Sequence, residues 1–136
     1  MDGVIIIRKA KVADIGAISR LIKFYAKRGK LLKRTKPDIK KNIRSFFVAL
    51  SDEHVVGCAY LDIYSRKMCE IRSLAVKEGE THRGIGKLLV KQCIESARKR
   101  KVREVMVITS SSENFFKQSG FNYTLPGERK ALFFNP

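Results

Sequence analysis

A short polar loop with two glycines is the part of this sequence whose residue types and spacing best suit ligand chemistry. The stretch Leu74–Leu89 reads LAVKEGETHRGIGKLL, and Gly84 and Gly86 stand where an amphipathic helix is expected to begin. Because glycine lacks a Cβ, a ligand can approach the backbone closely there. The N–H groups of a helix's first turn have no partner within the helix, and the helix dipole favours negative charge beside them. The loop therefore predicts a pyrophosphate site on the amides from His82 to Lys87.

Basic residues around the two glycines support this site, but the known phosphate-binding motifs are absent. Three basic side chains lie within two residues of a glycine of this pair: His82, Arg83 and Lys87. The GxxxxGK[ST] pattern of a P-loop and the third glycine of a dinucleotide fingerprint are both absent. Taken alone, the glycines are explained equally well by a tight turn into a packed helix, so the surrounding elements have to decide.

Composition limits the class of protein and its partners. The chain has 136 residues, the size of one domain, with 29 Lys and Arg against 13 Asp and Glu, a net charge of +16. Such a charge suits nucleic acid, an anionic membrane surface or a polyanionic ligand, and it also suits ordinary solvated faces. No apolar run approaches the ~20 residues of a membrane span, and the N-terminus has no secretion signal.

The cysteines point to a reducing environment. Cys58, Cys69 and Cys93 are odd in number and form no CxxC pair. One histidine, His82, lies between Cys69 and Cys93, but without a CxxC pair a disulfide framework and a zinc site are both poorly supported. We therefore expect no metal and a cytoplasmic location.

The apolar periodicity and the turn residues predict alternating strands and helices along the whole chain. Strands are expected at Val4–Arg8, Phe46–Leu50, Val55–Tyr64, Met68–Val76 and Glu104–Thr109, with closing pieces at Phe121–Tyr123 and Ala131–Phe134. Helices are expected from Asp14 to Gly29, around Pro37–Ile43, over Gly84–Lys101 and over Glu113–Ser119. The middle strands form an antiparallel meander, and the long helix makes a crossover to a parallel strand. The expected fold is α/β (α+β), one domain over residues 1–136, with a mixed central sheet and helices on both faces.

In this context the loop resembles the signature of the GNAT superfamily of acyl-CoA-dependent N-acetyltransferases. The superfamily motif Q/R-x-x-G-x-G/A falls on Thr81–Gly86, with Thr81 in place of the usual Gln or Arg. The first strand and helix, the meander, the loop–helix and the stretch Phe115–Phe121 follow in the superfamily's order. The resemblance implies the GNAT-type fold and acetyl-CoA as co-substrate.

The resemblance also implies where acetyl-CoA binds. The strands Met68–Val76 and Glu104–Thr109 would separate at their C-terminal ends, and the pantetheine arm would lie between them. The expected contact residues belong to the strand ends and the loop: Leu74, Ala75, Val76, Thr81, His82, Arg83, Gly84, Ile85, Gly86, Lys87 and Thr109.

The expected chemistry is the attack of an amine on a thioester. Strand alternation places Glu70 and Arg72 on one face together with Leu74 and Val76. By resemblance, Glu70 is the catalytic general base, although a structural partnership with Arg72 explains it equally well. The N–H of Leu74 or Val76 is the expected oxyanion donor. Phe116 stands where the superfamily has a tyrosine acid, so either water protonates the leaving thiolate or the chain is an atypical member.

Within the superfamily, four stretches resemble the acetyltransferase domain of N-acetylglutamate synthase (ArgA type, short stand-alone form): Gly29–Ile43, Cys69–Val76, Ile108–Phe121 and Leu125–Pro136. The resemblance implies acetylation of a small acidic amino acid, glutamate first, and a part in arginine biosynthesis. Lys33 and Arg34 match the basic pair placed over the acceptor, and Arg72 faces the expected cleft. Arginine binds a carboxylate through two parallel hydrogen bonds. Lys33 and Arg34 are also explained by the solvated basic stretch Lys23–Lys41, and we favour a functional role for Arg34 only.

One departure concerns the end of the chain. The subgroup continues into an R-x-S segment that helps to hold the acceptor, whereas this sequence stops at Pro136 and carries no fused amino-acid-kinase-like domain. We therefore expect glutamate to bind weakly, unless the second subunit of a homodimer supplies the missing edge.

Two other function classes stay open. One is a non-catalytic acetyl-CoA-binding protein of the same fold. The other is a basic nucleic-acid or ribosome-binding module, which predicts aromatic residues interleaved with basic ones on an open sheet face. Because Phe46, Phe47 and Tyr64 are expected in core and hairpin positions, we expect a small-molecule amine acceptor and neither a nucleic-acid nor a membrane partner.

Overall fold

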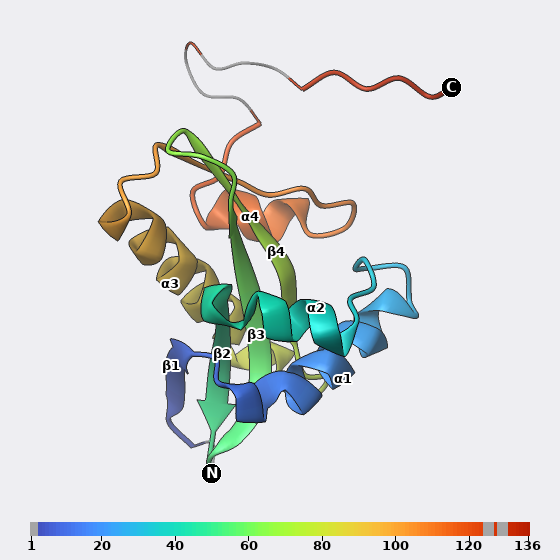
Figure 1. The fold of residues 1–136 in the computed structure, drawn as a ribbon, viewed down its shortest axis with the longest axis vertical. Coiled ribbons are helices and arrows are strands. Elements are labelled where there is room, and N and C mark those ends of the chain that lie inside the picture. The colour runs from blue at the N-terminus through green and yellow to red at the C-terminus, as the bar shows by residue number, and fades with distance from the viewer. Residues whose placement is uncertain (1–2, 124–126, 128–130) are drawn as a thin grey trace.

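A mixed sheet with helices on both faces forms the centre of the computed structural model, which describes residues 3–123, 127 and 131–136 (Figure 1). The strands lie in the order β1 (Ile5–Lys9), β2 (Phe46–Ser51), β3 (His54–Ile63), β4 (Met68–Val76) and β5 (Glu104–Met106). The helices are α1 (Ile15–Ala26), α2 (Lys36–Lys41), α3 (Ile85–Lys99) and α4 (Glu113–Gln118). The expected fold class is confirmed.

The pairing of the strands explains where the sheet opens. β1 to β4 form an antiparallel meander, and α3 connects β4 to the parallel strand β5. The β4–β5 pairing covers only Met68–Glu70 against Glu104–Met106. Beyond Glu70, β4 therefore continues without β5 beside it, which leaves one edge of its C-terminal half unpaired.

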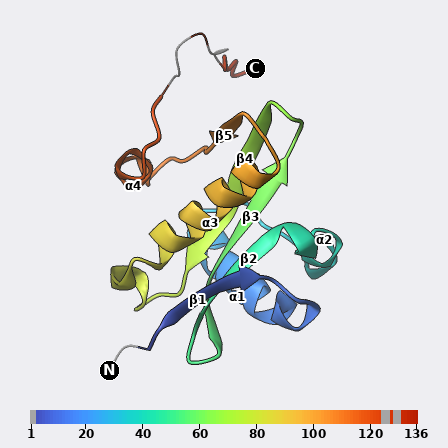
Figure 2. The same cartoon turned by 90° about the vertical axis from the view of Figure 1, so that its left-hand side faces the viewer.

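Figure 2 shows α3 on one face of the sheet and α1 on the other, and each face carries its own core. The amphipathic helix α3 buries Ile85, Leu89 and Cys93 against one face. On the other face, α1 and α2 bury Ile18, Ile22 and Ile39. The buried residues of α1 and α3 recur with the 3.6-residue periodicity that the sequence predicts, whereas Leu88 of α3 is exposed.

A bulge in β4 overturns one prediction about its faces. Ser73 has a positive φ of 53°, and the register against β3 shifts so that Tyr60 pairs with Arg72 and Cys58 with Ala75. The extra residue reverses the alternation of side chains beyond it. Leu74 and Val76 consequently pack on the α3 face, whereas Glu70 and Arg72 pair with Asp62 and Tyr60 on the α1 face. The prediction that these four residues share a face was wrong.

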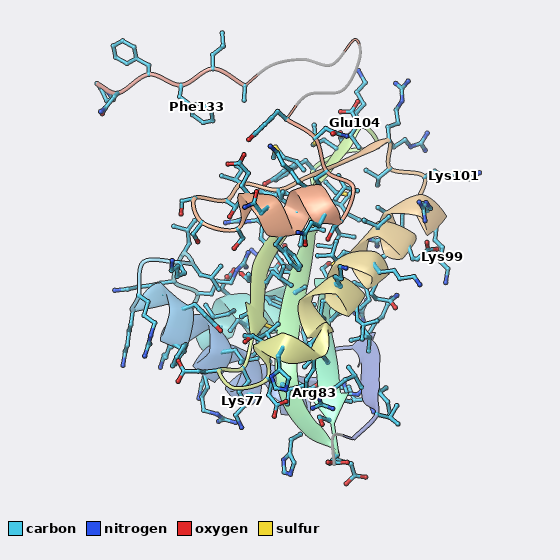
Figure 3. The ribbon with its side chains drawn as sticks, turned by 180° about the vertical axis from the view of Figure 1, so that it is seen from behind. Lys77, Arg83, Lys99, Lys101, Glu104 and Phe133 are labelled. Carbon is cyan, nitrogen blue, oxygen red and sulfur yellow. The ribbon has the colours of Figure 1, made fainter. Side chains whose placement is uncertain are left out.

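Several expected elements end elsewhere. β5 stops at Met106 rather than Thr109, and neither Phe121–Tyr123 nor Ala131–Phe134 forms a strand. Phe121 instead packs edge-on against Phe116 of α4, while Leu132, Phe133 and Phe134 are exposed. Figure 3 shows Phe133 away from the sheet. Of the stretch Leu125–Pro136 that carries a family resemblance, residues 125, 126 and 128–130 lie outside the described residues.

Asp14, at the expected start of the first helix, does not cap α1. Its carboxylate accepts bonds from the Arg8 guanidinium (2.7 Å) and the Lys11 amide (2.7 Å), and it makes no capping bond to α1. The Arg8 hydrogen bond holds the pKa of Asp14 below its usual value. Asp14 thus ties β1 to the start of α1.

The described residues include no helix long and apolar enough to cross a membrane. Cys58, Cys69 and Cys93 are all buried free thiols. Burial raises the pKa of Cys58 and Cys93 to about 12, so neither thiol is ionised near neutral pH.

Candidate active site

A cleft of about 1130 Å³ opens where β4 continues beyond β5. Its floor is the C-terminal part of β4, including Leu74, Ala75 and Val76. One wall comes from the start of α3 and from the chain after β5: Thr81, Gly84, Gly86, Lys87, Ile108–Ser112, Phe115 and Phe116. The other wall comes from α1 and the loop after it, with Tyr25, Lys30, Leu31, Leu32 and Arg34. Glu70, Arg72 and Tyr64 lie at the end nearest the β3–β4 turn.

The N-terminus of α3 is open toward this cleft. Gly84 precedes the helix with φ 72°, a left-handed conformation that favours glycine, and no side chain caps the first turn. A Cβ at Gly84 would meet nothing within 4 Å, so space remains beside the backbone. A Cβ at Gly86 would lie 3.2 Å from the Phe115 ring. Gly86 therefore lets the helix pack against α4, and Gly84 leaves the first-turn amides accessible.

The side chains of the glycine loop divide between two tasks. Thr81 and Lys87 line the cleft, whereas Ile85 is fully buried in the core. His82 is exposed and does not line the cleft. Arg83 is directed inward: its guanidinium donates to Ser51 Oγ (2.9 Å) and to the Gly3 carbonyl (2.5 Å).

Arg83 also pairs with Glu80 at 3.0 Å, and only 7% of its side chain is exposed. Figure 3 shows it near the first turn of α3, at the opposite end from Lys99. We expected its charge to surround a ligand, but the side chain instead fastens the loop to β2 and to Gly3, which precedes β1. The backbone of Arg83 is its remaining means of contacting a ligand.

Tyr25 fixes the end of β4 from the opposite side. Its hydroxyl donates to the carbonyl of Val76 at 2.5 Å, across 51 residues of sequence. Burial raises the pKa of Tyr25, so the phenol keeps its proton. Tyr25 lies within the helix expected from Asp14 to Gly29, but the sequence gave no sign of this contact, because a hydrogen bond to a distant carbonyl leaves no local pattern.

Glu70 is buried on the α1 face and accepts a hydrogen bond from the Tyr64 hydroxyl. This bond to the carboxylate is the main reason that the pKa of Tyr64 is raised to about 12. Arg72 forms its ion pair with Asp62 at 3.1 Å. The structural partner of Glu70 is therefore Tyr64, a residue that sequence reasoning assigned only to the hairpin.

Arg34 is a buried cation in the wall of the cleft, with 8% of its side chain exposed. Its Nε donates to Ser73 Oγ at 2.9 Å, and its Nη1 pairs with Asp38 at 2.8 Å. The guanidinium lies 4.3 Å from the centre of the Tyr60 ring. These contacts fix its orientation beside the β4 bulge. Lys33, by contrast, is exposed and lines a different hollow.

The end of the cleft near α4 offers few proton donors. Phe116 lines it and carries no ionisable group. Thr109 also lines it, and its Oγ1 accepts the Ser112 amide at 2.9 Å, which shapes the turn into α4. Among the described residues, the tyrosines that line the cleft are Tyr25 and Tyr64, and no group of His, Cys, Asp and Glu could hold a metal ion.

The mixed sheet, the separated β4 and β5 and the open helix N-terminus define an acyltransferase architecture, and comparison with known proteins gives the same class. The family model described as Acetyltransferase (GNAT) family matches residues 15–121. The chain is 44% identical over 115 residues to an uncharacterized N-acetyltransferase, CT2212, of Chlorobaculum tepidum, covering 85% of this chain and 74% of that protein. It is 34% identical over 123 residues to an amino-acid acetyltransferase of Mycobacterium tuberculosis, covering 85% and 67%.

A solved structure supports the relationship. N-acetylglutamate synthase from Neisseria gonorrhoeae, complexed with coenzyme A and N-acetyl-glutamate, matches with a TM-score of 0.85 and 26% identity. The match covers 95% of this chain and 31% of that longer chain. The chain belongs to the GNAT acetyltransferase family. It is an acetyl-CoA-dependent N-acetyltransferase.

Proposed function

We propose that the chain transfers the acetyl group of acetyl-CoA to the amino group of a small dicarboxylic amino acid, glutamate first. The observation that carries this proposal is Arg34, a buried cation held in the cleft wall between Ser73 and Asp38. Arginine is well suited to binding a carboxylate. The similarity to amino-acid acetyltransferases supports the same acceptor class.

The position of acetyl-CoA follows from the backbone of the cleft. Its pyrophosphate accepts hydrogen bonds from the first-turn amides of α3 beside Gly84, with Lys87 adding charge. Its pantetheine arm lies along Leu74–Val76, the part of β4 that β5 leaves unpaired. The thioester then lies near the Ser73 bulge, where Arg34 reaches β4.

The chemistry needs a neutral amine, a stabilised oxyanion and a protonated leaving group. Glu70 takes a proton from the acceptor ammonium, directly or through water, and the amine lone pair attacks the thioester carbonyl carbon. A backbone N–H of β4, from Leu74 or Val76, stabilises the oxyanion. Collapse of the tetrahedral intermediate breaks the C–S bond, and the CoA thiolate takes a proton from water because Phe116 has none to give.

The acceptor assignment is tested by a thiol-release assay with glutamate, aspartate, glutamine and lysine at low and high salt. Arg34→Ala should raise the KM for glutamate about ten- to a hundredfold, the effect of losing one hydrogen-bonded charge partner. Its effect on a neutral amine should be far smaller. Lys33→Ala is the matched control, because it removes a neighbouring charge outside the cleft and should leave the KM within about twofold.

A better rate with lysine or a polyamine than with glutamate would show that the carboxylate argument is wrong. Thermal unfolding of both variants separates binding from folding, since Arg34→Ala also removes the partner of Asp38. Asp38 is 42% exposed and can be hydrated, so we expect the variant to fold.

We further infer a cytoplasmic location and, from the proposed product, a part in arginine biosynthesis. The three free, buried thiols support a reducing compartment. Fractionation of cells that express the chain, and rescue of a strain unable to acetylate glutamate, test these two inferences separately.

A further inference from the structure

A second hollow, of about 600 Å³, lies between α1 and the segment 33–36. Figure 1 shows α1 and α2 on the same side of the sheet, joined by the loop that contains this segment. The α1 side consists of Ser19, Ile22, Lys23, Ala26 and Lys27. Their spacing of three and four residues places them on one helical face, so the hollow follows a continuous strip of α1. The opposite side consists of Lys33, Arg34, Thr35 and Lys36.

The charge of this hollow has a single sign. Four exposed lysines line it: Lys23, Lys27, Lys33 and Lys36. None of them forms an ion pair with a described carboxylate, and no Asp or Glu lines the hollow. Asp38 lies nearby but is engaged with Arg34 and Asn42. Lys23 and Lys27 are four residues apart, and like charges at this spacing on a helix repel each other. An anion bound between them would relieve this repulsion.

The shape and lining of the hollow favour a small ligand. Ser19 and Ile22 are 2% and 1% exposed, so a buried polar and apolar floor lies beneath the basic rim. A concave site of this size suits a metabolite-sized molecule rather than an extended polymer. Lysine presents a compact charge that suits phosphate, whereas the planar fork that matches carboxylates belongs to arginine. The hollow has one arginine, Arg34, against four lysines.

Arg34 lines both the hollow and the cleft, so it is a wall that the two spaces share. On the cleft side its Nε bonds Ser73 at the β4 bulge, and its Nη1 bonds Asp38 of α2. An anion among the four lysines would compete with Ser73 and Asp38 for the guanidinium. A shift of the guanidinium toward the hollow would weaken its hold on a carboxylate in the cleft.

We propose that this hollow is an effector site for a small molecule that carries at least two phosphate groups, and that its occupancy weakens acceptor binding through Arg34. The binding half is independent of the proposed reaction, whereas the effect on the acceptor rests on that proposed function.

Binding is tested by calorimetric titration with inorganic tripolyphosphate at moderate salt, in the presence of saturating CoA. Lys23→Ala/Lys27→Ala should weaken the affinity about tenfold or more. Lys40→Ala/Lys41→Ala is the matched control, because it removes the same charge from exposed positions of α2 outside the hollow, and should change the affinity by about twofold or less. The backbone resonances of Ser19, Ile22 and Ala26 should shift with the same midpoint.

Equal weakening in the two double variants, or no shift at the three floor residues, would overturn the site, because diffuse attraction to a +16 chain gives both results. Citrate is the second probe, and an affinity equal to that of tripolyphosphate would overturn the phosphate assignment. The tripolyphosphate titration is repeated with Gly84→Val. This substitution disrupts the N-terminus of α3 and should leave the affinity of the hollow for tripolyphosphate unchanged. A CoA site that fails is thereby distinguished from a hollow that fails.

The effect on the acceptor is tested at saturating acetyl-CoA with whichever acceptor the thiol-release panel identifies. Tripolyphosphate should raise the KM for that acceptor about threefold or more in the parent and leave it unchanged in Lys23→Ala/Lys27→Ala. A rise that persists in the double variant would mean that the anion acts in the cleft itself, and would overturn transmission through Arg34. A constant KM in the parent, despite calorimetric binding, would overturn it too.

Discussion

The α3 side of the cleft is built from backbone, whereas the α1 side is built from side chains. On the α3 side, the essential features are the left-handed Gly84, the uncapped first turn and the unpaired part of β4. On the α1 side, Arg34, Glu70 and Tyr64 come from three separate parts of the chain. Arg34 is oriented by its bond to Ser73, and Glu70 by the bond that it accepts from Tyr64. A site made of backbone amides binds any ligand that carries the matching anionic group, whereas a site made of side chains can discriminate among acceptors. This difference supports the proposal that the common donor binds on the α3 side and the particular acceptor on the α1 side.

The largest effect is expected from a substitution that disrupts the backbone at the N-terminus of α3. Gly84→Val should lower the affinity for acetyl-CoA about a hundredfold, because a β-branched residue at φ 72° is strained and its side chain covers the amides. Gly79→Val is the matched control. Gly79 also has a positive φ (89°) and open space around it but does not line the cleft.

Calorimetry with CoA should therefore show normal affinity for Gly79→Val and nearly none for Gly84→Val, with similar thermal stability in the two. Unchanged affinity in Gly84→Val would show that the pyrophosphate lies elsewhere.

The next effect concerns the chemistry on the side-chain side. Glu70→Gln should lower kcat about a hundredfold at neutral pH, the contribution expected of a positioned general base, with little change in the KM for acetyl-CoA. Asp62→Asn is the control, because it removes the neighbouring carboxylate that pairs with Arg72 but not the bond to Tyr64. If kcat and its pH profile match the parent in Glu70→Gln, the residue is only structural.

A smaller effect concerns the Tyr64–Glu70 bond. The hydrogen bond to Glu70, together with burial and the charge of the carboxylate, raises the pKa of Tyr64 to about 12. Glu70→Gln removes that charge, so the pKa of Tyr64 should fall toward the ordinary value of about 10. Ultraviolet titration of phenolate absorbance measures this shift, and Tyr64→Phe identifies which titration step belongs to the residue. A step that does not move in Glu70→Gln would show that the bond is absent in solution.

The same contrast between the two sides explains what the sequence could predict. The glycine loop is a local pattern, and both glycines and the helix behind them lie where the spacing indicates. The order β2–β3–β4 followed from the short turns between these strands, and the parallel placement of β5 followed from the crossover through α3. The faces of β4 beyond Ser73 could not be read, since one bulge residue in a left-handed conformation reverses every side chain after it.

Contacts between distant residues were the other limit. Arg83 carries the same charge as Lys87 four residues later, yet only the fold shows that Ser51 and Gly3 lie within its reach. Tyr64 was assigned to the hairpin because nothing in its neighbourhood announces Glu70 as a partner. Arg34 was singled out by resemblance, and its orienting contacts with Ser73 and Asp38 became visible only in three dimensions.

The smallest effect is expected where a side chain supports the backbone side from across the cleft. Tyr25→Phe removes the donor to the Val76 carbonyl, a bond worth about 1 kcal/mol, and frees the end of β4 from α1. Because Val76 belongs to the strand proposed to hold the pantetheine arm, the KM for acetyl-CoA should rise about threefold, whereas the KM for the acceptor should stay constant. Tyr64→Phe is the matched control, since it also removes one phenol from the cleft but at the Glu70 end, and it should alter kcat more than the KM for acetyl-CoA. Steady-state kinetics with each substrate varied in turn measures kcat and the two KM values of each variant. If Tyr25→Phe altered the two KM values equally, the division of the cleft into a backbone side for the donor and a side-chain side for the acceptor would be wrong.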